Sequence, residues 1–346
     1  MVALPEQVIS SQTIPAGTIV TAASYFFDRI RPDCEILAVP AKDLRPGHVE
    51  WQFGSIAAAP ERTGTGLRKL VNSNGRPVSV PEDRWIIDLR TNSPANWAHF
   101  LNNHLPIVFG LADAAGLDHT RAVAILPGDI PDYIVTVAHE FGLDTLKSDA
   151  EVHGQGLSYA LAPWQALRAA RFGWSRLPTM QAALAALLKR SDGPPLPKKV
   201  FLKREKTRTL MNFDEIESLL VARGFETLLP ETLPPADQIR LFREADEIVA
   251  IHGAGLAPLL YCAPGAGPRR LIEILPCGHM TDVYRVIAHQ VGTRWIGVRG
   301  RLKPEYVRPA YRLDKDFIKY SLDPFEADPM SLDRAFEMSD AEERVQ

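Results

Sequence analysis

The sequence predicts an α/β protein with two domains, each built on a parallel β-sheet. From Trp85 onward, short apolar runs alternate with longer segments of helical periodicity, which is typical of doubly wound sheets. A Pro/Gly stretch from Ser191 to Pro197 interrupts the alternation, and this indicates a linker between two domains. The length of 346 residues, 46% of them hydrophobic, is sufficient for two compact cores.

Residues 1–193 are expected to form the N-terminal domain. Its first part, 1–84, is rich in Pro, Gly and short apolar runs and predicts short strands and loops. Its second part, 85–193, predicts alternating strands and helices. The expected strands are 85–89 and 122–126, and the expected helices are 95–115, 131–141 and 181–189.

Residues 194–302 are expected to form the C-terminal domain, with Rossmann-like alternation. Asn212 and Glu215 form a capping-box pattern that starts a helix, and Gly224 ends it. The other expected helices are 235–244, 256–262 and 281–290, and the expected strands are 199–202, 225–229, 247–251, 271–275 and 294–298. The polar tail, 303–346, is expected to pack back on the N-terminal domain.

Composition narrows the function classes. The net charge of -3 gives no general attraction to nucleic acid, so we expect no nucleic-acid partner. The spacing of the three cysteines matches neither a metal site nor a disulfide scaffold, which is consistent with a protein of a reducing compartment. No apolar stretch is long enough to span a membrane and the first residues do not resemble a signal peptide. We expect a cytoplasmic protein, with peripheral association at the inner face of the membrane left open.

The most informative motif is a Gly-rich turn after the apolar run 247–251. His252, Gly253, Ala254, Gly255 and Leu256 connect this expected strand to an apolar segment with Pro258 in its first helical turn. Glycines let phosphate oxygens approach the backbone, and the N–H groups at a helix start attract anions. The alternative is a tight turn with glycine for steric reasons alone, but such a turn does not require a histidine.

Two further features are expected at the same sheet edge. Arg204 and Arg208 follow the strand 199–202, and guanidinium groups can clamp a diphosphate, although a solvated loop is the alternative. Glu273 lies inside an apolar strand, where a carboxylate needs a partner. A ribose diol would satisfy it, and a salt bridge to Arg269 or Arg270 is the alternative.

A polar stripe marks the start of the helix expected at 95–115. Asn96, His99 and Asn103 have spacings of three and four and share one helical face, whereas His104 is five residues from His99 and lies on another. Such a stripe suggests a site in which a histidine acts as general base, with a structural histidine as the alternative. Asp314 and Asp316, an Asp-x-Asp string in the polar tail, are interpreted as surface charges.

These motifs together resemble glycosyltransferase family 61, which includes plant β-1,2-xylosyltransferases, secretory-pathway O-GlcNAc transferases and bacterial proteins of polysaccharide and capsule synthesis. The family pattern appears in order along the chain. It comprises Asn96, His99 and Leu105-Pro106, then Arg204, Asn212 with Glu215, Gln238 with Phe242, His252 to Leu256, Pro264-Gly265 and Ile272-Glu273-Ile274. Members often have an acidic residue where Asn103 stands, and Asn103 cannot act as a base.

The resemblance implies a GT-B-like fold, with two Rossmann-like domains facing across a cleft. It implies an inverting transfer of a hexosyl or pentosyl group from a nucleotide diphosphate sugar, expected to be UDP-linked, to a hydroxyl of a glycan or polysaccharide. No cofactor and no metal are required. His99 is the first candidate base and His104 the second, with Asn96 and Asn103 on the acceptor side. The expected donor-binding residues are Arg204, Arg208, Gln238, His252, Gly253, Ala254, Gly255, Leu256 and Glu273.

Two alternatives remain open from the sequence. Because of Asn103, the chain could be a non-catalytic protein that binds a nucleotide sugar or a glycan. A nicotinamide-dependent oxidoreductase is more remote, since no G-x-G-x-x-G follows an early strand.

Overall fold

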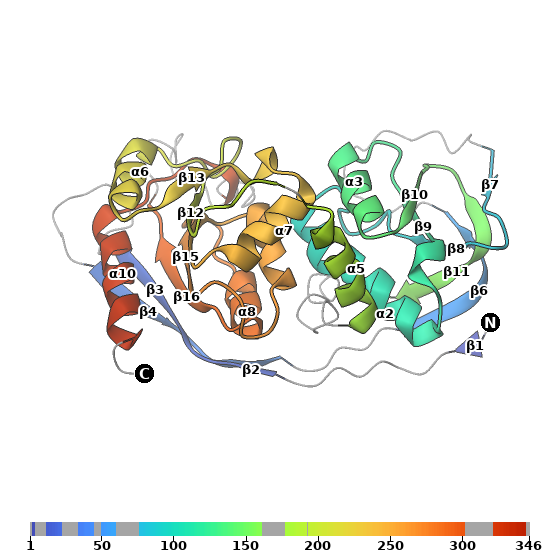
Figure 1. Cartoon of the computed structure of the whole chain (residues 1–346), viewed down its shortest axis with the longest axis horizontal. Coiled ribbons are helices and arrows are strands. Elements are labelled where there is room, and N and C mark those ends of the chain that lie inside the picture. Colours follow the sequence, from blue (N-terminus) through green and yellow to red (C-terminus); the bar gives the residue numbers. More distant parts are fainter. Residues whose placement is uncertain are drawn as a thin grey trace, which may run out of the picture. The chain divides into compact units, whose positions relative to one another are not determined.

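The computed structural model of the chain describes residues 2–3, 12–22, 34–44, 50–59, 76–160, 177–191, 193–301 and 321–343 (Figure 1). The chain divides into two compact units. The first comprises residues 1–11 and 45–192, and the second comprises residues 12–44 and 193–346. The division at 192/193 falls within the Pro/Gly stretch that indicated a linker. The Asp-x-Asp string at Asp314 and Asp316, interpreted as surface charges, lies outside the described residues.

The second unit is built on a seven-stranded sheet. Its strands, in spatial order, are β13 (Glu226–Leu228), β12 (Lys199–Leu202), β14 (Glu247–Ile251), β15 (Arg270–Leu275), β16 (Arg294–Arg299), β3 (Gly17–Ala22) and β4 (Cys34–Val39). All neighbours are parallel except β3 and β4. The carboxyl ends of β12, β14 and β15 therefore lie along one edge, where loops of open α/β sheets bind ligands.

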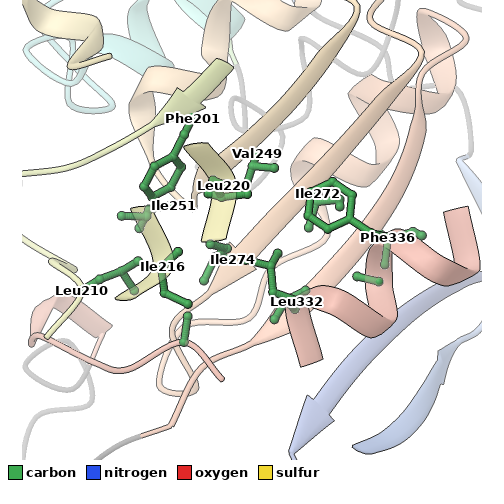
Figure 2. Close-up of a cluster of buried hydrophobic side chains, with 14 of the residues drawn as sticks. Phe201, Leu210, Ile216, Leu220, Val249, Ile251, Ile272, Ile274, Leu332 and Phe336 are labelled. Atoms are coloured by element: carbon green, nitrogen blue, oxygen red, sulfur yellow. The ribbon is translucent and has the colours of Figure 1, made fainter. Parts of the chain in front are cut away.

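Helices cover both faces of this sheet (Figure 1). On one face, α6 (Phe213–Ala222) and α10 (Pro329–Glu343) bury their apolar residues against alternate strand positions. Figure 2 shows this core, in which Ile216 and Leu220 of α6 and Leu332 and Phe336 of α10 meet the isoleucines of β14 and β15. Three more helices of this unit pack together, since α7 (Pro235–Glu244) and α8 (Val283–Gln290) each contact the 3-10 helix η6 (Ala254–Tyr261), and α8 also contacts β16.

Two expectations about domain boundaries are wrong. Residues 12–44 belong to the C-terminal unit, because β3 pairs with β16 and the short strands β2 (Gln12–Ile14) and β5 (Lys42–Leu44) pair with each other. The described part of the tail also belongs there, since α10 packs on β16, β3, β4 and α6 of the second unit. Its buried apolar face completes the core of the second sheet.

A buried ion cluster holds the amino ends of β14 and β15. The Glu247 carboxylate is 2% exposed and accepts hydrogen bonds of 2.5 Å from both Arg269 and Arg270, and Arg270 also pairs with Asp340 of α10. Burial alone would raise the pKa of Glu247, but the hydrogen bonds from the two arginines more than offset burial and lower it. These arginines pair with Glu247, so neither is the salt-bridge partner considered for Glu273.

The first unit is built on another sheet with a parallel centre. Strands β11 (Val152–Ala160), β8 (Trp85–Asp88), β9 (Ala122–Leu126) and β10 (Asp144–Lys147) are parallel neighbours, and β6 (Glu50–Ala58) joins β11 antiparallel. Short strands β1 (Val2–Ala3) and β7 (Val78–Ser79) pair with β6 and β11. Its helices include α3 (Asp132–Glu140), the 3-10 helix η2 (His119–Arg121) and α5 (Pro178–Lys189).

The helix expected at 95–115 is broken by a π-helical segment. It consists of α1 (Trp97–His99), the π-helix η1 (Phe100–His104) and α2 (Leu105–Ala115). Pro106 has no N–H to donate to the Asn102 carbonyl, so an α-helical bond is missing there. The N–H of Leu105 instead reaches back five residues to Phe100 O. This wider turn changes which side chains share a face.

Candidate functional site

The Gly-rich turn lies at the carboxyl end of β14, as the sequence indicates. His252 N–H donates to Ile274 O (2.9 Å) and anchors the turn to β15. The first helical bond of η6 runs from Leu256 N–H to Gly253 O (3.1 Å). The N–H groups that precede Leu256 in the turn therefore have no acceptor within the helix. This is the arrangement with which helix starts bind anions.

Arg204, directly after β12, lies against this turn. A Cβ atom placed on Gly253 would be 2.7 Å from the Arg204 Cζ, so only glycine permits this approach. The backbone of Gly253 is extended, with φ 164°, and the need for glycine is therefore the close guanidinium rather than backbone strain. Arg204 also donates from Nε and Nη2 to the carbonyl and hydroxyl oxygens of Thr207 (2.9 and 2.8 Å).

A second guanidinium approaches the same edge. Arg208 has a left-handed backbone with φ 56°, and its Nε donates to Ser321 O (2.6 Å). Burial lowers the pKa of both Arg204 and Arg208, and in Arg208 the neighbouring Arg204 adds to the effect. Two partly buried cations side by side favour an anion between or beside them. A small cleft of about 20 Å³ at this edge is lined by Arg204, Pro230 and Gly255, among others.

Glu273 is fully buried and does not face an open site. One carboxylate oxygen accepts from His252 Nδ1 (2.5 Å) and the other from Trp295 Nε1 (2.6 Å). Both expectations for this residue are thus corrected, because its partners are side chains of the flanking strands rather than a ribose diol or Arg269 and Arg270. The reason is that an apolar strand at the centre of a sheet has neighbours on both sides, and these satisfy the carboxylate.

In the first unit, both candidate histidines contact one backbone carbonyl. His99 Nδ1 lies 3.2 Å and His104 Nε2 3.3 Å from Asn92 O. The expectation that these rings lie on different faces is wrong, because the π-helical turn brings residues five apart onto one side. Asn92 and Ser93 both have left-handed backbones, with φ of 58° and 57°. Conformations of this kind are uncommon outside glycine and often occur at functional sites.

The two histidines differ in exposure. His104 is 2% exposed, and burial lowers its pKa to about 4. A neutral ring enclosed in this way is a poor general base, so His104 is withdrawn as a candidate, whereas His99 is partly exposed. Asn96 is the N-cap of α1, since its side chain accepts from the N–H groups of Ala98 and His99 (3.0 and 3.2 Å). Asn103 is 4% exposed.

The chain is also similar to known proteins. Residues 97–267 match the family model described as Glycosyltransferase 61. The chain carries a glycosyltransferase family 61 domain. In addition, the alpha-1,3-arabinosyltransferase XAT3 of Oryza sativa subsp. japonica is 33% identical over 92 residues. That similarity covers 26% of this chain and 16% of the rice protein.

The family 61 segment begins in α1 and ends after η6, so it includes parts of both units. It contains the two candidate histidines, both arginines of the sheet edge and the Gly-rich turn. Gln238 is also within it, at the start of α7, where its buried amide donates to Leu233 O (3.0 Å). This hydrogen bond fixes the loop that precedes α7. Direct contact between Gln238 and the nucleotide sugar stays a prediction. Leu256, a residue of η6, has a buried side chain that is 1% exposed.

Three residues beyond the family 61 match were missed from the sequence. Tyr284 Oη donates to Gly253 O (2.7 Å), and the His279 ring is centred 5.2 Å from that of His252. Burial lowers the pKa of His279 to about 4, with His252 and Arg208 adding to the effect. The third is Trp295, which holds Glu273. For Tyr284 and Trp295, the available signal was an aromatic residue within an apolar segment, at 283–290 and 294–298.

The described residues contain no group of three or more His, Cys, Asp or Glu side chains placed to hold a metal ion. None of their helices has the length and apolar character to cross a bilayer. The expected independence from metals stays a prediction.

Proposed function

We propose that the protein is an inverting glycosyltransferase. It transfers a sugar from a nucleotide diphosphate sugar, with UDP as the expected carrier, to a hydroxyl of a glycan or polysaccharide. The observation that carries this proposal is the contact between Arg204 and the Gly-rich turn of the family 61 domain. A cation and N–H groups without helical acceptors converge there, and a diphosphate presents complementary charge and acceptors to both.

The leaving group determines the role of this sheet edge. As the bond between the anomeric carbon and the diphosphate oxygen breaks, the electron pair stays with the diphosphate and its charge increases. Arg204, Arg208 and the N–H groups of the turn would stabilise that charge without rearrangement, since their positions are fixed by hydrogen bonds within the protein. In this proposal the two guanidiniums supply the positive charge and no metal is needed.

His99 is the proposed base. A carbonyl oxygen only accepts hydrogen bonds, so the contact with Asn92 O assigns the proton of a neutral His99 ring to Nδ1. The Nε2 lone pair is then available to take the proton of the acceptor hydroxyl while that oxygen attacks the anomeric carbon from the side opposite the diphosphate. Inversion of the anomeric configuration follows. A GT-B arrangement of the two units and a cytoplasmic location are part of the same proposal.

A donor panel tests the binding half of this proposal. Titration calorimetry with UDP, GDP and their sugar conjugates should identify a nucleotide that the wild-type protein binds and Arg204→Ala binds more weakly. Arg223→Ala is the matched control, because Arg223 is an exposed arginine of the same unit paired with Asp333. Equal affinities of wild type and Arg204→Ala for every nucleotide bound would refute the diphosphate site.

Turnover tests the catalytic half. His99→Gln should bind the donor like wild type but lose about 100- to 10,000-fold in transfer rate, which is the usual contribution of a general base. His139→Gln, an exposed histidine of α3, is the control. Transfer at the wild-type rate by His99→Gln would exclude His99 as base, and NMR of the product shows whether the anomeric configuration is inverted.

A further inference from the structure

The register of the central strands places Glu273 between two small residues. On β14 its direct partner is Ala250, and on β16 it is Gly297. Side chains two positions along a neighbouring strand lie on the same face and within diagonal reach. Those positions are occupied by His252, after Ala250, and by Trp295, before Gly297. The sequence thus places one carboxylate between an imidazole and an indole on a single sheet face.

The three side chains form a continuous buried chain of hydrogen bonds. Trp295 Nε1 donates to Glu273 Oε2 (2.6 Å), and Glu273 Oε1 contacts His252 Nδ1 (2.5 Å). Trp295, Glu273 and His252 are 8%, 0% and 4% exposed. Buried polar groups of this kind hold one another in a fixed orientation, since breaking either bond would leave a partner without compensation.

Two glycines create the space that the indole needs. A Cβ atom on Gly297 would lie 2.9 Å from Trp295 Cη2, and one on Gly17 would lie 3.2 Å from Cζ3. The ring therefore lies across Gly297 toward Glu273, with β3 closing its other edge. On this side the indole also lines a cavity of about 240 Å³. The position of Trp295 is thus determined by the packing of β3 and β16.

The chain also determines which ring nitrogen of His252 is free. An indole N–H only donates, so it keeps one carboxylate oxygen as an acceptor and fixes the carboxylate orientation. The second oxygen accepts from His252, which places a proton on Nδ1 and leaves Nε2 as the nitrogen available to a ligand in the turn. Besides Glu273, the titratable side chains against this ring are His279 and Tyr284, whose rings are centred 5.2 and 5.6 Å away. Arg204 and Arg208 are the nearby cations, since both act electrostatically on Tyr284 and Arg208 also acts on His279.

We propose that Trp295 is a positioning residue for the nucleotide site. Through Glu273 it holds the His252 ring in one orientation and one tautomer, with Nε2 directed to the ligand that the Gly-rich turn binds. This inference rests on the proposed function only for the identity of the ligand. The arrangement of the ring itself is a property of the free protein and is measured separately.

The test combines NMR with UDP binding. In ¹H–¹⁵N spectra of the imidazole groups, wild-type His252 should show a proton on Nδ1 and a single ring state. Trp295→Phe removes the indole N–H, so the His252 nitrogen shifts should move toward a mixture of tautomers and the Kd for UDP should rise about tenfold, which corresponds to one charge-assisted hydrogen bond. Glu273→Gln, which is nearly isosteric, should change the same signals.

Trp85→Phe is the matched control, because Trp85 is a buried tryptophan whose Nε1 donates to Asp118 O (2.8 Å) in the other unit. It should leave the His252 signals and UDP binding unchanged. Unchanged His252 signals in both Trp295→Phe and Glu273→Gln would overturn the inference, even if UDP binds. Absence of UDP binding by the wild type would count against the proposed donor instead, and the NMR comparison would still decide the role of Trp295.

Discussion

Replacing Gly253 with alanine is expected to weaken nucleotide binding by displacing Arg204. The added Cβ would lie 2.7 Å from Arg204 Cζ and closer still to Nη1, whereas carbon atoms pack at about 3.5 to 4 Å. The guanidinium must therefore withdraw by roughly 2 Å, since Nη1 is its closest atom. The extended backbone of Gly253 accepts alanine without strain, so the substitution acts through the arginine.

The size of the effect follows from what the guanidinium does. If withdrawal removes one charged hydrogen bond to the diphosphate, the cost is about 1.5 to 3 kcal/mol, or roughly 10- to 150-fold in Kd. Calorimetric titration with UDP measures it directly. A double variant, Gly253→Ala with Arg204→Ala, should bind no more weakly than Arg204→Ala alone, because both changes remove the same contact.

Gly154→Ala is the control for adding a methyl group. The nearest atoms to its Cβ would be at 3.5 Å, which is ordinary contact, and it should bind UDP like wild type. The reasoning fails if Gly253→Ala retains wild-type affinity while Arg204→Ala loses it. It also fails if the two losses add in the double variant, since additivity would mean that they act at independent places.

Two stability predictions follow from buried charges. Between pH 6.5 and 4, the His104 ring of the unfolded chain takes up a proton, whereas the folded ring, with its pKa of about 4, resists protonation. The free energy of unfolding should therefore fall by about 3 kcal/mol over this pH range. Urea unfolding of His104→Gln should show a smaller decrease. An equal decrease in the variant would contradict this. Glu247→Gln removes the negative charge that pairs with the buried Arg270, so the free energy of unfolding, measured in urea at pH 7, should fall by about 3 kcal/mol. Asp333→Asn, at an exposed ion pair, should lower it by only about 0.5 kcal/mol. Comparable losses in the two variants would show that burial of the Glu247 pair is unimportant.

Local features of this chain could be predicted from the sequence with good accuracy. The bounds of β12, β14 and α7 are the expected ones, because each combines a clear apolar pattern with a sharp boundary residue or proline. The same pattern predicts the position of the Gly-rich turn at the end of β14. In contrast, the π-helix at 100–104 requires the specific effect of Pro106 on the preceding carbonyl, which a 3.6-residue period does not represent.

Long-range pairing could not be predicted from the sequence. Glu273 is separated from His252 and Trp295 by about 20 residues on each side, and only the strand order makes them neighbours. Once that order is known, Ala250 and Gly297 indicate the contact, because small partners opposite a buried carboxylate leave space for the diagonal residues. Likewise, no local signal in residues 12–44 indicates that β3 pairs with β16.

The assignment of residues 12–44 to the second unit has a consequence for biosynthesis. The chain passes between the units three times, and Thr18 of β3 finds its partner Ile296 only when nearly the whole protein has been made. At ordinary rates of translation this strand waits on the order of ten seconds to a minute with its buried face uncovered. Deletion of the first 44 residues therefore removes β3 and β4 from the sheet of the second unit, and expression of residues 193–346 alone would yield a sheet with an open edge at β16.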